Sequence, residues 1–305
     1  IITPVTNNIV DIAQSSEDFT SLVAALQKAD LVTTLQTEGP FTVLAPTNAA
    51  FSTFLLDNGF GSLDEVPTDI LTNVLLNHVI SGSVASTDLS TGYTNTLATS
   101  SASNSPMSLF VDTSNGVRFN GTSSVTTANI SADNGIVHVV DAVIGLPTIA
   151  TFATSNNALS NLVDALAYAD SGSPTVPYIS TVSDASAGPF TVFAPTNDAF
   201  ANLLTEINAT ALTDLSTSTV NDVLLYHIVG ANVQSGQLTT GTVETLGGNI
   251  TADTSDFTLT DPNNRVSNII TSLVDIQAEN GVVHVIGKVI LPLQQPTTNN
   301  IVDVA

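Results

Sequence analysis

The chain has 305 residues, which is enough for two domains that each bury their own core. Only four Lys and Arg residues stand against 27 Asp and Glu residues, so the formal net charge is −23. So few bases cannot form the basic face that nucleic acid or an anionic membrane surface requires. Cysteine is absent, which excludes thiolate catalysis, Cys-ligated zinc and disulfides.

The ends of the sequence and its apolar runs bear on export and membrane contact. The chain opens on IITPVTNN, with no initiator Met, basic segment or hydrophobic signal core, so we expect a processed or excised segment. The most apolar run, 135–147, is interrupted by His138 and Asp141 and is too short to cross a bilayer. We therefore expect no membrane span in this segment.

Internal repetition organises the sequence. Four segments recur in the same order, at offsets of 140 to 149 residues: 21–30 at 161–170, 41–51 at 190–200, 73–82 at 222–231, and 134–144 at 280–290. This predicts one domain over 1–147 and a second over 148–293, here called the first and second repeats. TNNIVDIA at 6–13 recurs as TNNIVDVA at 298–305, so 294–305 is predicted to be a linker and the truncated start of a third repeat.

Within each repeat the hydrophobic period changes from helical to strand-like. The apolar residues of 19–26 recur at helical spacing, and those of 159–166 repeat the pattern. Next comes a short strand at 41–45 and a helix for which Thr47 is the expected N-cap. A further helix is expected after Pro67, with Thr68 as its cap, and short strands fill the region from about Val84 to Leu146. Helices followed by strands predict an α+β fold, with helices packed on mostly antiparallel sheets.

These motifs resemble those of fasciclin-type domains. FTVLAPTNAAF and FTVFAPTNDAF resemble the first signature box, and NGIVHVVDAVIGLP and NGVVHVIGKVILP resemble the second. The resemblance implies two tandem domains, each a wedge of two mostly antiparallel β-sheets flanked by helices. It also implies extracellular proteins, secreted or anchored at the cell surface, that mediate cell adhesion or matrix contact, with no catalytic residues and no obligatory cofactor.

The resemblance also implies candidate binding residues. One is an Asp-Ile pair just before the second box, which the second repeat has as Asp275 and Ile276. The first repeat departs from this pair, with Asn129 and Ile130 at the same place. The other is a Tyr-His pair, which the second repeat has as Tyr226 and His227. The first repeat departs from it, with Asn77 before His78. If either pair serves adhesion, the second repeat is the better candidate.

Each candidate also has a packing interpretation, which the residue patterns favour. His78 and His227 lie four residues after Val74 and Val223 on the apolar face of a helix, and polar groups at such positions usually complete a hydrogen-bond network. Ile276 is expected to anchor a strand, and Tyr226 is expected to pack more than to recognise a partner. No HxH or HExxH spacing supports a metal site.

Charged residues outside these pairs carry two further expectations. Arg118 and Arg265 are expected in local ion pairs or turns. The acidic segments 253–256 and 261–264 offer carboxylates that calcium could use, but no calcium loop is present, so solvated turns are expected there.

The functional hypothesis is an extracellular adhesion or matrix-binding protein that acts through multivalent tandem domains. Its expected partners are matrix or cell-surface glycans or proteins, or further copies of the chain, with calcium as a possible bridge between acidic surfaces. The alternatives are an inert spacer that presents another module, and a carbohydrate-binding protein. No signature of an enzyme is found, so the chain is not expected to be one, and no cofactor is expected.

Overall fold

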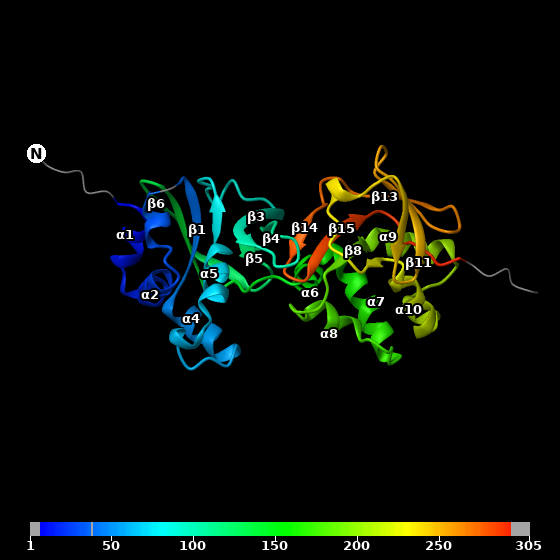
Figure 1. Cartoon of the computed structure of the whole chain (residues 1–305), viewed down its shortest axis with the longest axis horizontal. Helices are drawn as coiled ribbons and strands as arrows, with labels where there is room; N and C mark the ends of the chain where they lie inside the picture. Colours follow the sequence, from blue (N-terminus) through cyan, green and yellow to red (C-terminus); the bar gives the residue numbers. More distant parts are fainter. Residues whose placement is uncertain (1–6, 38, 294–305) are drawn as a thin grey trace, which may run out of the picture. The chain divides into compact units, whose positions relative to one another are not determined.

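The computed structural model describes residues 7–37 and 39–293 (Figure 1). The predicted start of a third repeat, 294–305, lies outside them. Of the described residues, one compact unit (unit 1) holds those up to Ser160 together with 180–189 and 276–282. The other (unit 2) holds 161–179, 190–275 and 283–293. The domain boundaries predicted at 147 and 293 stay predictions.

In the first repeat, helices precede most of the strands. The helices are α1 Ile9–Gln14, α2 Thr20–Lys28, α3 Val32–Thr37, α4 Asn48–Asp57 and α5 Thr68–Leu76, with short 3-10 helices η1 Glu17–Phe19 and η2 Leu63–Glu65. The strands are β1 Phe41–Pro46, β2 Val79–Ser81, β3 Gly92–Thr99, β4 Pro106–Asp112, β5 Arg118–Phe119, β6 Ser123–Ala132 and β7 Gly135–Val140.

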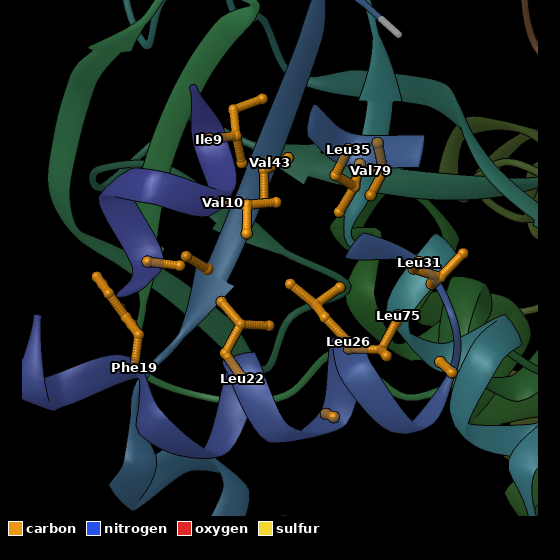
Figure 2. Packing of buried hydrophobic residues seen from close by; sticks show 14 of the residues in the cluster. Ile9, Val10, Phe19, Leu22, Leu26, Leu31, Leu35, Val43, Leu75 and Val79 are labelled. Carbon is orange, nitrogen blue, oxygen red and sulfur yellow. The ribbon is translucent and has the colours of Figure 1, made fainter. Parts of the chain in front are cut away.

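The amphipathic helix predicted at 19–26 is confirmed as α2, and it covers one face of the sheet. Leu22 and Leu26 of α2 point toward Val43 on β1, and α1 adds Ile9 and Val10 to the same cluster (Figure 2). All five side chains are at most 5% exposed. At about 1.5–3 kcal/mol for each fully buried aliphatic side chain, this cluster is a principal stabilising contact of the first repeat.

The seven strands of the first repeat are hydrogen-bonded in the order β2-β1-β7-β6-β5-β4-β3. Every pair is antiparallel except β1 with β7, which run parallel. The long strand β6 pairs with β7 along most of its length and with β5 at its start, and its register with β7 shifts at Val125, Thr127 and Ile130. Such bulges bend and twist a strand, so β6 belongs to both of the ladders that the wedge requires.

The second repeat follows the same chain order. Its helices are α6 Ile149–Ser155, α7 Ser160–Ser171, α8 Tyr178–Ser183, α9 Asn197–Glu206 and α10 Thr217–Leu225, with η3 Asn157–Leu159, η4 Leu212–Asp214 and η5 Ser235–Gln237. Its strands are β8 Phe190–Pro195, β9 Ile228–Val229, β10 Gly241–Thr245, β11 Gly248–Asp253, β12 Thr258–Thr260, β13 Val266–Asn268, β14 Ile276–Ala278 and β15 Gly281–Ile286. They form two four-stranded sheets, β10-β11-β12-β13 and β14-β15-β8-β9.

The expected caps are confirmed at two matched positions and wrong at a third. The hydroxyl of Thr47 accepts from the backbone N–H of Ala50 at the start of α4, and Thr196 repeats the contact at α9. Thr68, by contrast, is the first residue inside α5, which begins after Pro67 without a side-chain cap. The proline lacks an N–H and has a fixed φ, so the chain enters the helix one residue earlier than a threonine cap would allow. Ser216 takes this place in the second repeat and does cap α10.

Candidate functional site

His78 and His227 occupy matched positions just after helices α5 and α10. The ring Nε2 of His78 accepts from the backbone N–H of Ile144 at 2.9 Å, and its Nδ1 lies 2.7 Å from the carbonyl oxygen of Val74. In His227 the corresponding distances are 3.0 Å to Ile290 N and 2.8 Å to Val223 O. Because Nε2 accepts a hydrogen bond in each ring, it carries no proton, so Nδ1 is the protonated nitrogen and each imidazole is neutral.

Burial controls the electrostatics of these two rings. Each residue is only 2% exposed. Desolvation lowers the pKa of both His78 and His227 from 6.5 to about 4, against a smaller upward effect of the hydrogen bond to the helix carbonyl. Both ring nitrogens are engaged with the backbone, so neither is available as a general base or metal ligand at neutral pH.

The residues that precede these histidines differ between the repeats. Asn77 is fully buried, where its amide donates to Gly145 O at 3.0 Å and its oxygen accepts from Thr96 Oγ1 at 3.1 Å. Tyr226 is half-buried against Gly247 and Gly248, and a Cβ built on Gly247 would lie 2.4 Å from Tyr226 Cδ2. Both residues therefore have packing contacts, as the sequence favoured for Tyr226.

The strand histidines, His138 and His284, adopt the opposite tautomer. Nδ1 of His138 accepts from the backbone N–H of Asn129 at 3.1 Å, and its Nε2 donates to Val84 O at 3.0 Å. His284 makes the same contacts with Asp275 N at 3.2 Å and Val233 O at 2.9 Å. Each ring therefore links the Asn129 or Asp275 backbone to the loop that follows β2 or β9.

Asn129 and Asp275 take up matched left-handed backbone conformations, with φ of 61° and 54°. Asn and Asp tolerate this region better than other side chains that carry a Cβ. Asp275 accepts from the backbone N–H of Ser235 at 2.6 Å and from its hydroxyl. Asn129 likewise accepts from the backbone N–H of Ser86 at 2.8 Å, but its amide Nδ2 donates to the Ser86 hydroxyl at 2.9 Å. We call each of these side-chain contacts a loop clip.

The isoleucines beside the loop clips pack toward the core, Ile276 fully buried and Ile130 partly buried. Ile276 is 1% exposed, which agrees with its packing interpretation, and Ile130 packs against the first-repeat core. The hydrogen bonds of the Asp-Ile pair and of the Tyr-His pair connect different segments, so no contact brings the two pairs into one site. A role of these eight residues in binding stays a prediction.

The acidic segments form local structure. Asp253 accepts from the N–H and hydroxyl of Ser255 at 2.9 and 2.6 Å, and these bonds lower its pKa. Asp261 is 4% exposed and pairs with Arg265 at 3.0 Å, and Arg265 also contacts Glu206 at 2.6 Å. Within 7–37 and 39–293, no group of three or more His, Asp or Glu residues is arranged to hold a metal ion.

One feature on the surface was missed by the sequence interpretation. A cavity of about 310 Å³ lies in unit 2 between α7, α9 and η4, together with the residue before η4. Its polar residues include Asp164 and Tyr168, which stand where the first repeat has Ala24 and Lys28. These are two of the four differences between the aligned segments 21–30 and 161–170, and the changes of charge at them are the signal that could have directed attention to the cavity.

The chain belongs to the Fasciclin domain family, whose profile matches residues 17–147 and 157–292. Two Synechocystis proteins are similar to single repeats. Uncharacterized protein sll1735 is 38% identical over 137 residues, or 45% of this chain and 96% of that protein, and Protein sll1483 is 36% identical over 136 residues, or 45% and 72%.

Similarity to human periostin extends over both repeats, at 29% identity over 267 residues, which are 85% of this chain and 29% of periostin. Among solved structures, a FAS1 domain pair from the insect cell adhesion molecule Fasciclin I aligns with 89% of this chain and 92% of its own, at a TM-score of 0.46 and 17% identity. No helix among the described residues is long and apolar enough to cross a membrane.

Proposed function

We propose that this chain is an extracellular, non-enzymatic adhesion or matrix-binding module that acts through its tandem domains. The observation that carries the proposal is that one chain holds two matches to the Fasciclin domain, each with its own histidine pair and loop clip in the same hydrogen-bonding pattern. Two similar domains on one chain offer two surfaces, so weak contacts gain avidity when both engage together.

The polar chemistry of the interior supports a role for the outside of the molecule. The four histidines are hydrogen-bonded to backbone groups, and the candidate residues before them make packing or loop contacts. These groups therefore build each domain. Recognition falls to the exposed surface, where an excess of 23 negative charges favours partners that carry positive charge.

The same charge makes contacts between copies of the chain depend on ions. Two surfaces of this charge repel each other unless salt screens them or divalent ions bridge them, and the Debye length falls from about 8 Å in physiological salt to about 3 Å at 1 M. We therefore propose calcium bridging only for contacts between copies of this chain. It predicts bead aggregation that rises with calcium beyond the effect of sodium at matched ionic strength.

The test is an adhesion assay with the chain on beads at graded density. Beads that carry the chain should attach to cells or to a matrix coat, and attachment should rise more steeply than linearly with density. Beads with an unrelated acidic protein of the same length serve as the control, because a spacer would have no contacts of its own. Equal attachment of the two kinds of beads would refute the adhesion function and favour the spacer.

A further inference from the structure

The cavity between α7 and α9 is lined by both apolar and polar residues. Phe200 and Leu204 come from α9, residues 211–213 from η4 and the position before it, and Asn161, Asp164 and Tyr168 from α7. The last three are spaced at i, i+3 and i+7, which places them on one face of α7. At about 310 Å³ the cavity is at the lower end of the size range of ligand sites.

The first repeat shows what the same place in the fold can hold. Lys28 matches Tyr168 in the repeat alignment, and 63–66 matches 212–215. The ammonium of Lys28 donates to three carbonyl oxygens, those of Leu63, Asp64 and Val66, at 2.6, 2.9 and 2.7 Å. This turn of backbone is therefore a cradle for a primary ammonium group, and in the first repeat it is filled by the chain itself.

The second repeat keeps the cradle but replaces the ammonium. Tyr168 donates its hydroxyl proton to Leu215 O at 2.8 Å, and a phenol has only that one proton to donate. It cannot also serve the carbonyls of Leu212 and Thr213, the counterparts of the other two acceptors of Lys28, and both residues line the cavity. Compared with the first repeat, the site has lost a positive charge.

A carboxylate has been added at the same time. Asp164 replaces Ala24 of the first repeat, is exposed, and lines the same cavity as residues 211–213. None of the residues that line the cavity is basic. A cation placed here would face a carboxylate and two backbone carbonyls, and its alkyl chain would cover Phe200 and Leu204.

We propose that this cavity binds the lysine side chain of a basic protein partner. The four methylene groups of lysine suit the apolar lining residues Phe200 and Leu204, and the ammonium has the donors that Lys28 uses in the first repeat. That the lysine belongs to a protein partner rests on the proposed adhesion function and on the net charge of −23. The site itself is defined by the cavity and can be tested without a partner.

The experiment is a titration of the isotope-labelled full chain with Nα-acetyl-lysine N-methylamide, followed by amide NMR shifts. We expect saturable shifts at 161–168 and 211–213, with a Kd on the order of 1 mM for so small a probe. The same probe with its ε-amine acetylated, which keeps the chain length but removes the charge, should produce no saturable shift.

Three variants make the assignment specific. Asp164→Ala restores the first-repeat residue and should weaken binding about fivefold, the upper range for an exposed ion pair. Tyr168→Lys should abolish binding because the chain's own ammonium would fill the cradle. Glu244→Ala removes an exposed carboxylate from β10 and is the control with the same change of charge.

Equal weakening by Asp164→Ala and Glu244→Ala would overturn the proposal, because the probe would then respond to overall charge. Equal binding of the acetylated probe, or no saturable shift, would overturn it too. If Tyr168→Lys does not fold, the comparison of probe binding by Asp164→Ala and by Glu244→Ala still tests the proposal. If the chain binds the lysine probe but beads that carry it do not adhere, the result counts against the adhesion function and not against this site.

Discussion

The two buried helix-end histidines make the stability of the fold depend on pH in a defined window. His78 lies in unit 1 and His227 in unit 2, and burial lowers the pKa of each from 6.5 to about 4. Above pH 6.5 the ring is neutral whether the chain is folded or not, so the full stability is present. As the pH falls from 6.5 toward 4, only the unfolded state takes up the proton, and stability is lost.

The size of the effect follows from the two pKa values. Relative to pH 8, the titration of each of these two histidines should remove about 2 kcal/mol of unfolding free energy by pH 5, and about 3 kcal/mol once the pH is below 4. In unit 2, burial also lowers the pKa of His284, which adds to the loss. The carboxylates of Asp214 and Asp253 do not contribute in this window, because their hydrogen bonds lower pKa values that start at 3.8. The loss between pH 6.5 and 5 therefore reports on the histidines.

Two measurements check this prediction. Urea unfolding followed by far-UV circular dichroism at pH 8, 6 and 5 should show the decline in free energy. Nitrogen-15 NMR of labelled histidine should show two rings protonated on Nδ1 and two on Nε2, because the chain has four histidines in two matched pairs. The Nδ1-protonated pair should stay neutral down to about pH 4, and titration of that pair near pH 6.5 would refute the reasoning.

Two substitutions test the packing of the candidate binding residues. Gly247→Ala should destabilise the second repeat by about 1–3 kcal/mol, because its Cβ would meet Tyr226 at 2.4 Å, whereas at Gly230 the nearest atom to an added Cβ is 3.8 Å away and the same change should have little effect in thermal unfolding. Asp275→Asn should be tolerated, since the first repeat has Asn in the matched loop clip, while Asp275→Ala should cost about 2 kcal/mol through the lost bonds to Ser235 and the left-handed φ. Equal stability of the two glycine variants, or of the two Asp275 variants, would contradict the packing roles assigned here.

Much of the fold could be predicted from the sequence because repetition doubles every local pattern. The helix at 19–26 and the Thr47 cap depend on spacing within a few residues, and both recur in the second copy. The interior role of His78 was predicted from its helical spacing of four residues after Val74, although α5 ends at Leu76, two residues before it. The cap expected at Thr68 was wrong because Pro67 moves the entry of the chain into the helix.

The rest depends on contacts between distant segments. Which nitrogen of His138 carries the proton is decided by Asn129 and Val84, and neither partner can be identified from the pattern around the ring. The ammonium cradle is likewise built from backbone carbonyls of 63–66, whose direction no residue type reveals. Only the fold shows that Lys28 and Tyr168, at matched positions of the two repeats, donate to carbonyl oxygens of matched backbone segments.

The central claim is that the interior of each repeat is structural and that its outside binds partners multivalently. Adhesion should therefore be measured for arrays of one, two and four copies of this chain, at equal total numbers of repeats on the surface. The account predicts that adhesive strength rises steeply with the number of copies in an array, by tenfold or more from one to four, since linked weak contacts gain about 10²–10⁴ in avidity. Arrays that adhere no better than a single copy would contradict it.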